Sequence, residues 1–154
     1  MENTKKIEIL NSLIVINNDR IEGYKTAEAE AKETDLKMLF SDLMETSVQN
    51  RKQLVEEVIL LGGTPDEETR ITGKFFRAWM DIKATFTGND RKTILDSCQY
   101  GEDIILETYQ KAMVEEHFEI NVDEENMLLK HFELLQSDLA KVKKLLYAIE
   151  NQKN

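Results

Sequence analysis

The sequence predicts an all-α protein with four long helices, arranged as two antiparallel helical hairpins that are joined by one long crossover. Two long segments on each side of a central connector carry apolar residues at helical spacing and almost no helix-breaking residues. The connector, residues 62–88, holds the only proline, the only tryptophan and four of the six glycines. The turn within each half is short, so the two helices that it joins must be antiparallel neighbours.

The first half predicts helices over residues 4–32 and 35–61. Apolar residues recur at spacings of three, four and seven in both segments. Gly62 is placed to end the second helix as its C′ residue, and Pro65 blocks any continuation.

The second half predicts helices over residues 89–118 and 123–150. Asn89 is expected to cap the first of them, and Asp90 to complement its dipole. Val122 and Met127 have the spacing of a hydrophobic staple around the start of the last helix.

Within the connector, the spacing of apolar residues predicts a short helix over residues 72–87 with a wide apolar surface. This surface either covers the bundle or forms an oligomer contact, and a small-ligand pocket lined by Trp79 and Phe86 is a third interpretation. Each main helix has about 28 residues and is therefore about 42 Å long, so the connector can travel the length of the bundle. The second and third helices would then be parallel, which is the ferritin-like arrangement. The apolar residues of the connector helix are Phe75, Phe76, Trp79, Met80 and Phe86.

Composition excludes several classes of function. With 154 residues, 41% of them apolar and 32% charged, the chain fits a single domain over residues 1–154. The net charge of −10 disfavours nucleic acid and anionic lipid as partners. A single cysteine and the lack of an apolar run of about 18 residues predict a cytoplasmic protein without a membrane span.

The apolar stripes turn polar together near the middle of the predicted bundle. Counting from the turns places Asn17, Arg51 and Glu102 at nearly the same height. The main interpretation is a structural layer in which a buried Arg51–Glu102 ion pair, with Asn17 nearby, fixes the register of the helices. Another is that the assigned stripes are shifted by one position, so that some of these residues face water.

A metal site in this layer is the alternative interpretation, with Glu28, Glu102 and His131 as its ligands. Ferritin-like di-iron proteins use a Glu-x-x-His pair on each of two helices. Neither pair is present, because the second predicted helix lacks histidine and Leu128 stands three residues before His131. Arg51 would also place a cation where metals bind.

No residue pattern supports catalysis. Cys98 lies on an apolar stripe, where a cysteine is more often a small core residue than a nucleophile. The chain has no glycine-rich phosphate loop and no nucleophile elbow. We therefore expect no cofactor and a non-enzymatic, structural or protein-interaction role, in a homo-oligomer or with a protein partner.

Short motifs spread along the chain resemble a bacterial ferritin-like four-helix-bundle family of unknown function. The resemblance implies the fold and a bacterial origin, and it implies no activity. Two motifs depart from it: Phe75-Phe76 stands where relatives commonly have Gly-His, and Gln99-Tyr100 where many have Glu-Arg. The matching residues are Asp19, Gly23-Tyr24, Arg51, Gly62-Gly63, Pro65, Gly73-Lys74, Arg77, Trp79 and Gly101-Glu102-Asp103.

Overall fold

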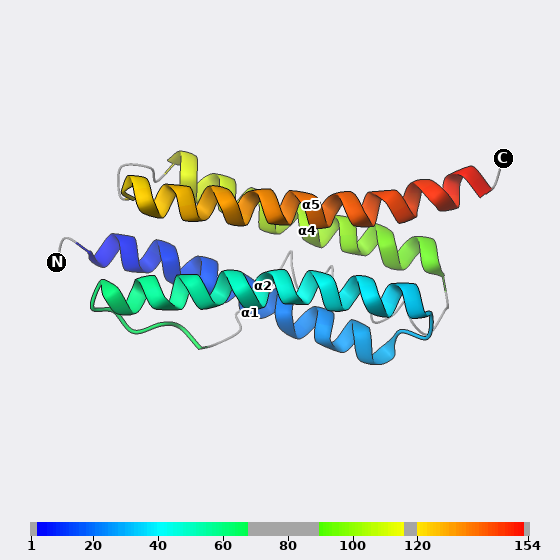
Figure 1. Ribbon diagram of the computed structural model, residues 1–154, viewed down its shortest axis with the longest axis horizontal. Coiled ribbons are helices and arrows are strands. Elements are labelled where there is room, and N and C mark those ends of the chain that lie inside the picture. The colour runs from blue at the N-terminus through cyan, green and yellow to red at the C-terminus, as the bar shows by residue number, and fades with distance from the viewer. Residues whose placement is uncertain (1–2, 68–89, 116–119, 153–154) are drawn as a thin grey trace.

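The part of the chain that the computed structural model describes is all-helical, in agreement with the predicted class (Figure 1). It comprises residues 3–67, 90–115 and 120–152. The predicted connector helix, Asn89 and the end of the third predicted helix lie outside these residues. The helices are α1 (Thr4–Glu30), α2 (Thr34–Leu60), α4 (Arg91–Glu115) and α5 (Val122–Gln152).

The four helices form a bundle in which α1 packs along α2, and α4 packs along α5 (Figure 1). Ion pairs show which helix ends meet. Lys6 near the start of α1 contacts Glu124 in the first turn of α5, with 3.1 Å between Nζ and Oε1. Arg91 at the start of α4 contacts Glu33 and Asp35 at the start of α2. Therefore α1 and α5 begin at one end of the bundle, whereas α2 and α4 begin at the other.

The apolar core is divided into two clusters by polar side chains. One cluster lies toward the start of α1 and includes Leu10, Ile14, Leu54 and Ile105. The other lies toward the turn between α1 and α2. Its buried members include Tyr24, Phe40, Leu43, Leu95, Cys98 and Val142. The buried polar residues between the clusters include Asn17, Arg20, Ser47, Glu102 and Asp138.

Side-chain caps set the starts of α4 and α5. Asp90 Oδ1 accepts hydrogen bonds from the backbone N–H groups of Lys92 and Thr93, so Asp90 itself caps α4. Asn121 and Glu124 form a reciprocal capping box at 2.8 and 2.9 Å, which starts α5 one residue earlier than predicted. The predicted staple is therefore wrong: Val122 lies inside the helix and is exposed.

Gly62 ends α2 as predicted, in the left-handed region with φ of 84°. The N–H of Gly62 donates to Ile59 O at 3.0 Å, and that of Gly63 donates to Val58 O at 2.9 Å, which is a Schellman motif. A Cβ on Gly62 would meet no atom within 4 Å, so only the backbone conformation disfavours a side chain there.

Gly62→Ala is therefore expected to lower the free energy of unfolding by about 1 kcal/mol, because alanine is strained at positive φ. Gly62→Asn is the matched control, since asparagine tolerates this conformation better. Urea unfolding followed by circular dichroism measures both losses. Equal stability of the alanine variant and the wild type would contradict the assignment of strain.

Candidate functional site

Arg20 of α1 lies in the middle of the bundle and contacts the other three main helices. Its side chain is fully buried. Its Nε and Nη2 donate to both carboxylate oxygens of Glu102 on α4, at 2.9 and 2.5 Å. Nη2 also donates to Asp138 Oδ2 on α5 at 3.0 Å, and Nη1 donates to Leu43 O and Ser47 Oγ on α2. Acceptors from α2, α4 and α5 thus satisfy the N–H donors of the planar guanidinium.

Arg20, Glu102 and Asp138 form a buried ion-paired layer across the bundle, and their opposite charges offset the cost of burying each group. Burial alone would lower the pKa of Arg20, but the charge and hydrogen bonds of Glu102 raise it above its usual range. The pKa of Asp138 is raised, because desolvation outweighs its contact with Arg20. Lys141 at the surface lies 3.7 Å from the other Asp138 oxygen and supplies a second positive charge.

Two neutral side chains lie beside the ion-paired layer. The hydroxyl of Tyr24 donates to Glu102 Oε2 at 2.9 Å, and the Arg20 guanidinium lies 5.2 Å from the centre of its ring. Burial, followed by the negative charge of Glu102, raises the pKa of Tyr24 and of the Cys98 thiol well above their usual ranges. Cys98 is thus a protonated core thiol, unlike the thiolates that act as nucleophiles.

A second polar group adjoins the layer and is centred on His131. The hydroxyl of Tyr109 accepts a hydrogen bond from Asn17 Nδ2 at 2.9 Å and lies 3.0 Å from His131 Nδ1. His131 Nε2 lies 2.7 Å from Gln53 Oε1, an acceptor. The hydrogen-bond pattern assigns a neutral ring with its proton on Nε2, while Nδ1 accepts the Tyr109 proton. Burial lowers the pKa of His131 to about 4.

Asp19 is a further buried ionisable residue, but it differs from the others in its hydrogen bonding. Its side chain is only 4% exposed, and neither carboxylate oxygen has a hydrogen-bond partner among the described residues. Burial raises the pKa of this carboxyl to about 7. The group is therefore protonated through much of the acidic range.

The predicted Arg51–Glu102 ion pair is wrong, because Glu102 binds Arg20 instead. Arg51 is partly exposed, and its Nε donates to Asn18 Oδ1 at 2.6 Å. Its neighbour Asn50 is the buried residue, and one position along a helix turns a side chain by about 100°. For Arg51, the alternative interpretation is therefore the correct one: the assigned stripe on α2 was shifted by one position, and Arg51 is partly exposed to water. Asn17 and Glu102 lie in the core.

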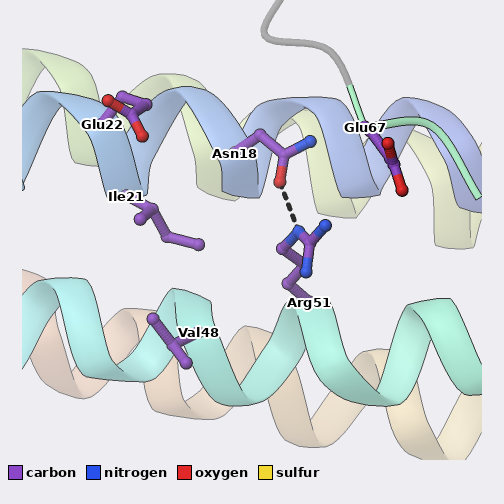
Figure 2. Close-up of a pocket in the computed structure, with 6 residues that line it drawn as sticks. All are labelled: Asn18, Ile21, Glu22, Val48, Arg51 and Glu67. Carbon is purple, nitrogen blue, oxygen red and sulfur yellow. Dashed lines mark hydrogen bonds between the residues drawn. The ribbon is translucent and has the colours of Figure 1, made fainter.

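Arg51 lines a groove between α1 and α2, with a volume of about 360 Å³ (Figure 2). Glu22 and Glu67 lie on either side of the Arg51–Asn18 contact. Two carboxylates beside one guanidinium make this groove a weak site for anions. The other lining residues are Ile21 and Val48.

The three residues considered as metal ligands are not brought together. Glu102 is bound by Arg20, and His131 contacts Tyr109, which is seven residues or about 10 Å further along α4. Glu28 lies about 12 Å along α1 from Arg20 and is partly exposed. In the described ranges, no group of three or more His, Cys, Asp or Glu side chains is placed to hold a metal ion.

Arg20 and Asp138 are the site residues that sequence reasoning missed. Arg20 stands three residues after Asn17 and four before Tyr24, so its spacing alone would place it on the buried stripe. The apolar Ile21 competes for that position in the pattern. The predicted contact residues of the connector, Phe75, Phe76, Trp79, Met80 and Phe86, lie outside the described residues.

These features define a class: a four-helix bundle whose core is divided by a buried, ion-paired layer. The chain belongs to a family described as a domain of unknown function (DUF2383), whose model matches residues 5–115. The matched region includes α1, α2 and α4, whereas α5 follows it. No curated protein and no solved structure gives a significant match. None of the described helices has the length and apolar character needed to cross a membrane.

Proposed function

We propose that this chain is a ferritin-like bundle of two antiparallel helical hairpins with a structural or protein-interaction role, rather than an enzyme. The resemblance of its motifs to a bacterial ferritin-like family supports this fold and a bacterial origin, and the single cysteine supports a cytoplasmic setting. Its partners are further copies of itself or another protein.

The observation that carries this proposal is the position of the Arg20 guanidinium. It lies at the middle of the bundle, where ferritin-like di-iron proteins collect carboxylate ligands. Both Glu102 oxygens and one Asp138 oxygen accept its hydrogen bonds. A metal cation entering here would have to displace the fully buried positive charge of Arg20 from these carboxylates. The occupied carboxylates therefore favour a layer that fixes the register of the helices over a metal site.

Exposed apolar side chains at one end of the bundle support the interaction role. Ile59 and Leu60 at the end of α2 are 60% and 80% exposed. Val122 at the start of α5 is 70% exposed. Because α2 ends where α5 begins, these three side chains belong to the same end of the molecule, and a partner there would remove them from water.

Light scattering over a range of concentrations tests the interaction role, since a lone chain has a mass of 17.9 kDa. We expect a multiple of this mass, and we expect Leu60→Glu to reduce it by opposing burial at the contact. Met38→Glu is the matched control, because Met38 is also exposed on α2 but lies near its opposite end. A strictly monomeric profile would contradict self-association and leave a different protein as the proposed partner.

Metal content tests the alternative role. Protein purified without a histidine tag from iron- and zinc-supplemented cells is expected to carry far less than one metal per chain. Glu102→Gln provides the comparison, because it removes a charge and retains the side-chain shape. Near-stoichiometric metal that this substitution abolishes would overturn the non-metal interpretation of the layer.

A further inference from the structure

The groove between α1 and α2 contains an arginine whose position is set by a buried asparagine. Asn18 on α1 is only 7% exposed. Its Oδ1 accepts a hydrogen bond from Arg51 Nε at 2.6 Å, and its Nδ2 donates to Asp66 O at 3.4 Å. These two contacts orient the amide, and in the described part of the chain they leave the Nη groups of Arg51 without a partner. Arg51 therefore has donors available for a ligand in the groove.

Two carboxylates line the same groove without pairing with Arg51. Glu22 and Glu67 are both exposed and lie on either side of the Arg51–Asn18 contact. That contact is the only hydrogen bond among the six side chains drawn in Figure 2. The groove, with a volume of about 360 Å³, thus presents charged groups of both signs with space between them.

Hydrogen bonds to the backbone place Glu67 on its side of the groove. Asn11 Nδ2 donates to Thr64 O at 3.1 Å, and Asn11 Oδ1 accepts a hydrogen bond from the N–H of Asp66 at 2.9 Å. Asn18, which lies two turns further along α1, binds the carbonyl of Asp66. The chain that leads to Glu67 is therefore attached to α1 at two points.

Apolar side chains separate Arg51 from one of the two carboxylates. Ile21 and Val48 line the groove about one helical turn from Arg51, toward the turn between α1 and α2. Glu22 lies on this side of Arg51, whereas Glu67 lies on the other side. A ligand bound by Arg51 would therefore reach Glu22 across an apolar surface, and Glu67 in the opposite direction.

We propose that the groove binds a basic α-amino acid, of which lysine is the simplest example. The α-carboxylate accepts hydrogen bonds from the Nη groups of Arg51, and the α-ammonium group contacts Glu67. The aliphatic stem lies over Ile21 and Val48 and brings the side-chain ammonium group to Glu22. Four methylene groups are long enough to cover one helical turn of about 5.4 Å. Each charge of the ligand then faces an opposite charge.

The charge balance of the groove favours this ligand over simpler ones. One guanidinium between two carboxylates leaves one negative charge unmatched, and a basic amino acid carries one extra positive charge. A simple anion would be opposed by both carboxylates, and a diamine by the guanidinium. A neutral amino acid such as norleucine would leave Glu22 unpaired.

Titration of nitrogen-15-labelled protein with lysine, followed by NMR, tests the proposal. We expect saturable shifts of the backbone amides of the residues that line the groove. Norleucine lacks the side-chain ammonium group, lysinamide lacks the carboxylate, and Nα-acetyl-lysine lacks the α-ammonium group. Each should bind about tenfold more weakly than lysine, because one charge-assisted contact is lost. No saturable shift with lysine at about 10 mM would overturn the proposal.

Two of these compounds also separate a free amino acid from the end of a peptide. Lysinamide resembles a lysine at the N-terminus of a peptide, and Nα-acetyl-lysine resembles one at the C-terminus. Binding of either compound as tightly as free lysine would overturn the free amino acid as the ligand and indicate a peptide end instead.

Substitutions test the assigned orientation of the ligand. Glu22→Gln should weaken lysine binding about tenfold and leave norleucine binding unchanged, since only lysine has a side-chain ammonium group. Arg51→Gln should weaken the binding of both ligands, although its amide can still donate to Asn18. Lys52→Gln is the matched control, because Lys52 is exposed and its substitution removes the same charge one residue away. Equal lysine affinities of Arg51→Gln and Lys52→Gln would overturn the proposal.

Discussion

Replacing Glu102 by alanine is expected to lower the free energy of unfolding by about 3–5 kcal/mol, because it leaves a buried arginine without its main counter-ion. Arg20 would keep its contacts to Ser47, Leu43 O and Asp138, but it would lose the bidentate Glu102 contact. The Tyr24 hydroxyl would lose its acceptor as well. Urea unfolding with circular dichroism at pH 7 measures the loss.

Asp103→Ala is the matched control for this substitution. Asp103 is the next residue on α4 and carries the same charge, but it is exposed. Its removal should change stability by no more than about 0.5 kcal/mol. Comparable losses for Asp103→Ala and Glu102→Ala would show that the ion pair is not the source of the effect.

Replacing the whole charged layer by apolar residues should restore most of the stability that Glu102→Ala removes. In the combined variant Arg20→Met, Glu102→Leu and Asp138→Leu, no buried charge is left unpaired. We expect it to unfold at a higher urea concentration than Glu102→Ala does. A combined variant less stable than Glu102→Ala would mean that the layer contributes more than matched charges.

The second large effect is a loss of stability at acid pH that depends on His131. The folded-state pKa of His131 is about 4, below its ordinary value of 6.5. The unfolded chain therefore binds more protons between these values, and the His131 contribution falls as pH decreases from about 6.5 to about 4. The whole loss amounts to about 3 kcal/mol, at 1.36 kcal/mol for each pKa unit.

Paired measurements isolate this contribution, because Asp19 acts in the opposite sense. The pKa of Asp19 is raised to about 7, so its contribution is lost as pH rises through the same interval. We therefore expect the stability difference between the wild type and His131→Gln to shrink as pH falls. Measuring His117→Gln in parallel shows how much the other histidine of the sequence contributes to the pH dependence. A constant difference between the wild type and His131→Gln would contradict a neutral, buried His131.

The all-helical class could be predicted because it depends on features that the sequence displays along its length. Apolar spacing locates the helices, and Gly62 ends α2 through a left-handed conformation that favours glycine. Counting residues out from the turns predicted Asn17 and Glu102 at one height, and both are buried, but Glu102 lies level with Arg20, whereas Asn17 contacts Tyr109, two turns further along α4. Helix locations, helix ends and approximate heights along the bundle depend on positions along the chain, so they can be estimated from the sequence alone.

The partner of Glu102 could not be predicted, because it depends on how each helix is rotated about its own axis. Residues 13–20 of α1 are all buried, so that stretch has no exposed face from which to define the rotation. An apolar Ile21 then appears a better core residue than Arg20. The rotation of α2 about its own axis likewise determines that Asn50 is buried, whereas Arg51 is partly exposed.

The cross-bundle ion pairs also determine which helices can assemble with one another. The α1/α2 pair presents Arg20 and Lys6 to the α4/α5 pair, which presents Glu102, Asp138 and Glu124 in return. Two copies of the α1/α2 pair, joined face to face, would instead bring two arginines together in an apolar core. The layer therefore selects against swapped assemblies during synthesis, when a newly made α1/α2 pair can meet another copy of itself before its own α4 and α5 are complete.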